Sequence, residues 1–151
     1  MTRLGIQLLL ALAGLTLIAL GMAILVTPHA FFATNGILLG SDPSLLSEIR
    51  APGAILALCG LFVVRGVVQR SRSRQALQIA TVVYGAYGAA RLLSIVLDGA
   101  PGSSLLWATG IELGFALLCA SVIEHEVVLQ GAEQSRSAQS HTTDHGLPAA
   151  A

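Results

Sequence analysis

Two charged side chains, Arg91 and Glu112, lie inside segments that are otherwise apolar enough to cross a membrane. A lone charge at the middle of a bilayer costs about 2.5–3.5 kcal/mol on insertion scales. A chain tolerates such residues when they pair, face a wet cavity or serve a function. At 1.5 Å of rise per residue, both lie roughly 10–14 Å from the turn between their segments, so antiparallel helices bring them to similar depth. A charge-assisted pair is geometrically natural, and the sequence leaves open whether the two side chains face each other.

Five polar residues of the third apolar segment form a stripe: Tyr84, Tyr87, Arg91, Ser94 and Asp98. They are spaced three or four residues apart, which places them on one helix face. Lipid offers no hydrogen-bond partners, so we expect this face to point into the bundle interior. Two further charges, Glu48 and Arg50, are expected at the same outer level on another segment. The candidate charge or ligand-binding cluster consists of Glu48, Arg50, Tyr84, Tyr87, Arg91, Ser94, Asp98 and Glu112.

The elements that position these residues follow from composition. Hydrophobic residues make up 54% of the 151 residues and charged residues 11%, and the mean hydropathy is +0.78. A soluble domain carries about 25% charged residues. We therefore predict an all-α fold, an integral membrane four-helix bundle over residues 1–130, and a disordered tail over 131–151. The predicted spans are about 5–26, 51–68, 75–97 and 103–126.

The first predicted span and the connection after it carry local signals. Gly14 and Gly21 lie on one face and favour close packing against another helix. A cleaved signal peptide is the alternative for this span, but the apolar run continues past the small-residue site at 21–23. Residues 27–47 contain too many apolar side chains for a free loop, so we predict a short interfacial segment. Asp42 before Pro43 predicts a helix start, and Pro52 predicts either a kink or the start of the span.

Arginine residues predict the orientation of the chain. Arg65, Arg70, Arg72 and Arg74 surround the second connection, whereas the third connection has no basic residue. The positive-inside rule then places this turn and both termini in the cytoplasm. We expect a multi-pass protein of the inner (plasma) membrane, with the lipid bilayer as its first partner.

Several classes of chemistry lack a signal. The sequence has no P-loop, dinucleotide fingerprint, catalytic triad pattern or zinc-protease motif. Consecutive residues 124–126, Glu-His-Glu, cannot converge on one metal ion from a helix. A net charge of +0 implies no whole-chain attraction to nucleic acid. We therefore expect no metal, no cofactor, no catalytic residue and no nucleic-acid partner.

These residues together resemble the domain-of-unknown-function family 4345. The resemblance covers about residues 4–128 and implies a small bacterial four-helix membrane protein with a polar set at its outer side and no known activity. Pro52 departs from the small residue expected at its position. The landmarks are Glu48-x-Arg50, Ala51-Pro52-Gly53, Gly85, Arg91, Ser94, Asp98-Gly99, Pro101 and Glu112.

Three functions remain open at this point. The first is a non-enzymatic membrane protein whose polar cluster stabilises the bundle and binds a small amphiphile or a partner, including a second copy. The second is a small proton-coupled transporter that uses Glu112. The third is an intramembrane acid–base enzyme acting on a lipid-like substrate through Glu112 and Asp98, assisted by Tyr84 or Tyr87. A paired Glu112 favours structure or anionic-ligand binding, and an unpaired Glu112 favours the other two.

Overall fold

The computed structural model describes residues 2–144, with side chains at 2–69 and 71–125. This part of the chain is helical apart from short connections. The elements are α1 (Arg3–Val26), α2 (Pro28–Ala33), α3 (Pro43–Val68), the short 3₁₀ turn η1 (Arg70–Arg72), α4 (Ser73–Asp98) and α5 (Ser103–Asp144). Within the described residues, four segments are long and apolar enough to cross a membrane: Arg3–Val26, Pro43–Val68, Ser73–Asp98 and Ser103–His125. The chain is therefore an all-α membrane protein, as the sequence predicted.

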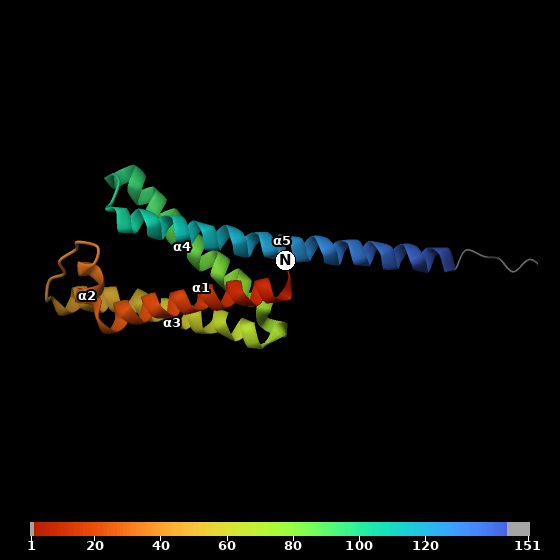
Figure 1. Ribbon diagram of the computed structural model, residues 1–151, viewed down its shortest axis with the longest axis horizontal. Coiled ribbons are helices and arrows are strands. Elements are labelled where there is room, and N and C mark those ends of the chain that lie inside the picture. Colours follow the sequence, from red (N-terminus) through yellow and green to blue (C-terminus); the bar gives the residue numbers. More distant parts are fainter. Residues whose placement is uncertain (1, 145–151) are drawn as a thin grey trace, which may run out of the picture.

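Helices α1 and α3 lie side by side over their length (Figure 1). Glycine makes this close approach possible, because a Cβ atom at Gly60 would lie 2.6 Å from the carbonyl oxygen of Gly14. A Cβ atom at Gly53 would lie 3.0 Å from the carbonyl oxygen of Gly21. The predicted packing role of Gly14 and Gly21 is confirmed, and it follows the use of small residues between membrane helices.

Helices α4 and α5 form a second pair, joined by the turn at residues 99–102, where Gly99 has φ 96°. This hairpin stays close to the α1–α3 pair at one end and diverges from it at the other (Figure 1). We call the end that holds η1 the closed end, and the end that holds residues 27–42 and 99–102 the open end. At the closed end, the Ser73 hydroxyl donates to the carbonyl oxygen of Gly66 at 2.8 Å.

The apolar core occupies the closed half, where all four long helices contribute. Tyr84 lies buried at the boundary of the core that faces the open end. Its hydroxyl donates to the carbonyl oxygen of Ala13 at 2.7 Å. Its ring stacks on Phe115 with centroids 4.9 Å apart. The buried hydrophobic residues are Leu9, Leu10, Ala13, Leu17, Leu56, Val63, Ala76, Leu77, Ala80, Tyr84, Ala116, Cys119 and Val122.

Helix α3 begins before the predicted span, which started at residue 51. It starts at Pro43, as the Asp42-Pro43 signal predicted, and the Asp42 carboxylate accepts from the backbone N–H groups of Ser44 and Leu45. Pro52 therefore lies inside a helix, and it leaves the carbonyl of Glu48 without its helical partner. The predicted interfacial segment contains α2 and an irregular stretch.

The last helix runs beyond the last predicted span, which ended at about residue 126. The backbone of α5 is helical as far as Asp144. The disordered tail predicted for residues 131–151 stays a prediction. Residues 145–151 of the predicted tail lie outside the described residues.

Candidate functional site

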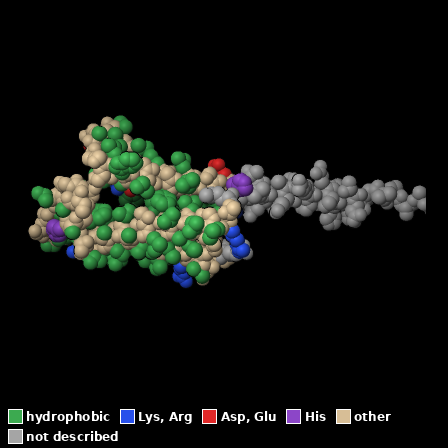
Figure 2. All heavy atoms as spheres, viewed as in Figure 1, with side chains coloured by type: hydrophobic (Ala, Val, Ile, Leu, Met, Phe, Trp, Pro, Cys, Tyr) green, Lys and Arg blue, Asp and Glu red, His purple; other side chains and the backbone are tan. Residues whose placement is uncertain are grey.

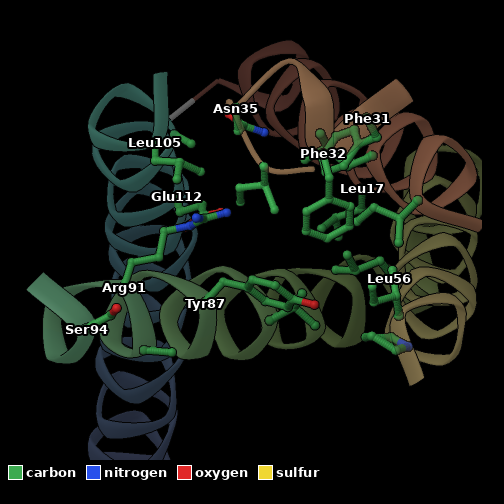
Figure 3. Close-up of a pocket in the computed structure, with 18 of the residues that line it drawn as sticks. Leu17, Phe31, Phe32, Asn35, Leu56, Tyr87, Arg91, Ser94, Leu105 and Glu112 are labelled. Atoms are coloured by element: carbon green, nitrogen blue, oxygen red, sulfur yellow. The ribbon is translucent and has the colours of Figure 1, made fainter. Parts of the chain in front are cut away.

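A cavity of about 700 Å³ separates the hairpin from the α1–α3 pair at the open end. Figure 2 shows it as a hollow between the two pairs, with basic and acidic side chains visible inside it. Figure 3 shows α4 and α5 on two sides, α1 and α3 opposite, and the connection after α1 across the top. Most of the lining is apolar, and the volume falls within the range of about 300–1,000 Å³ typical of small-molecule sites.

Arg91 and Glu112 meet on the hairpin side of this cavity. The Arg91 Nε atom donates to Glu112 Oε2 at 2.8 Å. The Glu112 side chain is 9% exposed and the Arg91 side chain 32% exposed. The depth match inferred from the sequence therefore corresponds to a direct ion pair, in which the carboxylate is buried and part of the guanidinium is open. Figure 3 shows one guanidinium nitrogen directed towards the cavity interior.

The polar stripe of α4 faces the same space over most of its length. Tyr84, Tyr87, Arg91 and Ser94 all line the cavity. Tyr84 borders the cavity on the side of the core, whereas Tyr87 is half-buried and lies one turn nearer the open end. The fifth stripe residue, Asp98, is exposed at the end of α4, where it accepts a hydrogen bond from the Ser94 hydroxyl at 3.0 Å.

The two charges at the start of α3 separate. Glu48 is exposed and lines the cavity wall. Arg50 lies outside the lining, and its Nε atom donates to the carbonyl oxygen of Leu25 at 3.2 Å. Among the described side chains, the structure thus joins Arg91 with Glu112 in an ion pair and leaves Arg50 and Asp98 away from them.

The sequence missed the opposite wall and the roof of the cavity. Phe31 and Phe32 reach it from α2, and their rings contact edge to face with centroids 5.5 Å apart. Asn35, in the turn after α2, accepts a hydrogen bond from the Ser104 hydroxyl at 3.0 Å, which ties the connection to α5 at the open end. The apolar content of residues 27–47 was the signal for the Phe pair; no sequence pattern indicates the contact between Asn35 and Ser104.

The arrangement suits binding rather than bond-making chemistry. Its apolar wall matches a hydrocarbon chain, and the open part of the ion pair offers hydrogen-bond donors to a polar head. Asp98, one of the two carboxyl groups expected for acid–base chemistry, does not line the cavity. Among the described residues, no group of three His, Cys, Asp or Glu side chains is placed to hold a metal ion.

The fold and site define a small polytopic membrane protein with a cavity of about 700 Å³ and, among its described side chains, an ion pair between two of its long helices. Within that class, the chain belongs to the family described as Domain of unknown function (DUF4345), which matches residues 5–123. The match covers every residue that lines the cavity. The resemblance found in the sequence is thereby confirmed. No curated protein and no solved structure matches the chain.

Proposed function

We propose that this protein is a non-enzymatic membrane protein that binds one small amphiphile in the cavity at its open end. The observation that carries the proposal is a cavity of about 700 Å³ with an apolar wall facing a partly open ion pair. An amphiphile has the same division between an apolar chain and a polar head. The ion pair also fixes the two helices of the hairpin in register, which gives it a structural role beside the binding role.

The ion pair argues against proton-coupled transport through Glu112. The Glu112 carboxylate is engaged by the Arg91 guanidinium at 2.8 Å, and its side chain is only 9% exposed. A transporter of this kind needs a carboxylate that is free to meet protons and substrate in turn, whereas this carboxylate is held by a partner on the neighbouring helix. The acid–base enzyme lacks the second carboxyl group expected for it, because Asp98 lies outside the cavity lining.

We infer an orientation in which the open end faces away from the cytoplasm of a cell with an inner (plasma) membrane. Arg65, Arg72 and Arg74 are exposed at or near the closed end, and basic residues near membrane helix ends favour the cytoplasmic side. Both termini then lie in the cytoplasm, and the cavity lies in the outer leaflet. Thiol labelling of intact cells with an impermeant reagent tests this orientation. Gly40→Cys, at the open end, should be labelled, and Ser71→Cys, at the closed end, should be protected. The background for both is Cys59→Ala/Cys119→Ala.

The binding proposal is tested by filling the cavity. Ala90 lines it, whereas the adjacent Ala89, which is likewise exposed, lies outside the lining. We expect native mass spectrometry of the full chain, extracted with a mild detergent, to detect one retained amphiphile in the wild type and in Ala89→Phe. Ala90→Phe should lose that species, because its ring occupies the space. Equal retention by Ala89→Phe and Ala90→Phe, or no retained species in any protein, contradicts the proposal.

A further inference from the structure

The charges on the cavity wall restrict the head of the ligand. The lining contains one basic side chain, Arg91, and two acidic side chains, Glu48 and Glu112, for a formal sum of −1. The positive charge is already neutralised, because Glu112 accepts from Arg91 at 2.8 Å. An anionic head would therefore meet a wall of net negative charge. A cationic head is attracted to Glu48 by the same net charge, but a cation placed at the open side of the ion pair lies against the Arg91 guanidinium. Both arrangements cost free energy where water is scarce.

The hydrogen-bond donors that the ion pair leaves unused indicate that the head of the ligand carries an acceptor. Arg91 uses Nε for Glu112 Oε2, and its terminal amino groups donate to no described protein group. Those groups carry N–H donors that the hydrocarbon region of a membrane cannot satisfy. No buried side-chain nitrogen or oxygen atom of the described residues lacks a partner, so the free amino groups are not sealed in the protein. Figure 3 shows them beside the cavity.

The apolar wall accounts for the rest of the ligand. Leu17, Leu56 and Phe32 lie across the cavity from the ion pair (Figure 3). Tyr87 lies between the two sides, half-buried, and no hydrogen bond of its hydroxyl occurs within the described residues. A hydroxyl group on the ligand would find a donor and an acceptor there.

We propose that the amphiphile has an uncharged, oxygen-bearing head, of the long-chain alcohol or glyceride type. Its oxygen accepts hydrogen bonds from the terminal amino groups of Arg91, and its chain packs against the wall formed by Leu17, Leu56 and Phe32. This inference rests on the proposed function and specifies its ligand class. It also revises the expectation of an anionic ligand, because Glu48 lies on the wall of the cavity.

The test uses three probes with one chain and different heads. Hexadecanol, hexadecyl sulfate and hexadecylamine are titrated at neutral pH into the full chain in phosphatidylcholine nanodiscs, with Ala90→Phe nanodiscs as the background for partitioning. We expect hexadecanol to bind about tenfold more tightly than either charged probe, because each charged head meets a like charge in a low-dielectric site.

Two variants give the inference a signature of its own. Glu112→Gln leaves the Arg91 charge uncompensated, so the preference should change from hexadecanol to hexadecyl sulfate. Glu48→Gln, at an exposed position that is safe for folding, removes one negative charge from the wall. It should raise the affinity for hexadecyl sulfate several-fold and leave that for hexadecanol unchanged.

The outcomes separate the two proposals. A wild type that binds none of the probes above the Ala90→Phe background contradicts the proposed function itself. Saturable binding with no preference, or with a preference for a charged probe, leaves the proposed function standing and overturns the uncharged head. An unchanged probe ranking in a folded Glu112→Gln, together with an unchanged hexadecyl sulfate affinity in Glu48→Gln, also overturns it.

Discussion

Tyr84 anchors the boundary between the core and the cavity through one hydroxyl group. Its hydrogen bond to the carbonyl oxygen of Ala13 joins α4 to α1 at 2.7 Å. We expect Tyr84→Phe to lower the free energy of unfolding by about 1 kcal/mol, the net value of a typical internal hydrogen bond. Thermal unfolding in detergent measures the change. Tyr87→Phe is the matched control, and an equal loss in both variants would refute the assigned role of the Tyr84 hydroxyl.

The ion pair should appear as an energetic coupling. Arg91→Met leaves Glu112 buried without its partner, and Glu112→Met leaves the guanidinium uncompensated. We expect each to lower the free energy of unfolding by about 2–4 kcal/mol. The double variant should lose clearly less than the sum, with a coupling of at least about 1 kcal/mol. Additive losses would mean that the two side chains do not stabilise each other.

At the residue scale, sequence reasoning reached the side chains whose position follows from helical periodicity. Depth along two antiparallel helices matched Arg91 with Glu112, and a spacing of three and four residues placed Tyr84 and Tyr87 on one face. It did not separate Arg50 from Glu48, because their side chains leave α3 in different directions. Their surroundings depend on how the chain folds after α1, and helical periodicity carries no information on that path.

At the element scale, glycine sets the spacing between α1 and α3. We expect Gly60→Ala to lower the free energy of unfolding by about 1–3 kcal/mol, because its Cβ would lie 2.6 Å from the carbonyl oxygen of Gly14. Gly114→Ala on α5 is the control, since nothing lies within 4 Å of its Cβ position. Thermal stability of the purified variants measures both. A loss at Gly114 as large as that at Gly60 would reveal a packed neighbour on that face of α5.

The N-cap of α3 should make stability depend on pH. Backbone N–H groups of Leu45 and Ser44 donate to the Asp42 carboxylate and lower its pKa below the usual 3.8. A lowered folded pKa gives a contribution that is present above the unfolded pKa and is lost as pH falls through the folded pKa.

Asp42→Asn isolates this contribution, because asparagine caps a helix without titrating. We expect the wild type to lose stability relative to Asp42→Asn between neutral pH and pH values below 3.8. Thermal unfolding of both proteins across that range provides the measurement. A difference between them that is independent of pH would rule out titration of the Asp42 cap.

Most elements were predictable because membrane helices have a strong compositional signature. The four apolar runs and the Asp42-Pro43 helix start agree with the structure. The prediction placed the start of the second span at residue 51, since hydropathy detects apolar runs and not the polar first turns of a helix. The last predicted span, 103–126, agrees with the apolar segment Ser103–His125, and the polar residues over which α5 continues to Asp144 carry no hydropathy signal.

At the scale of the whole molecule, two helix pairs pack at one end and diverge at the other (Figure 1). A sequence-based prediction of a four-helix bundle does not contain this divergence. Apolar faces pack against lipid as readily as against protein, so the pattern of apolar residues does not distinguish a closed bundle from an open one. The cavity could therefore be found only in the structure and not from the sequence.

Occupancy of the cavity should stabilise the whole protein. A ligand that binds only the folded state adds about 2.7 kcal/mol at one hundred times its dissociation constant. We expect hexadecanol to raise the unfolding temperature of the wild type and of Ala89→Phe, but not that of Ala90→Phe. Differential scanning calorimetry of the three proteins in nanodiscs provides the comparison. An equal rise in all three proteins would indicate an effect on the bilayer and not on the cavity.

The division between a packed closed half and a hollow open half also bears on how such a protein can evolve. Substitutions on the cavity wall, at positions such as Ala90 or Ala108, change what fits without disturbing the glycine contacts between α1 and α3 or the buried core. Leu17, Leu56 and Tyr84 belong to both the core and the cavity wall, so they are the wall positions at which stability and the proposed selectivity are coupled. On the proposed function, a lineage would change its ligand at the remaining wall positions while the closely packed glycine contacts stay constant.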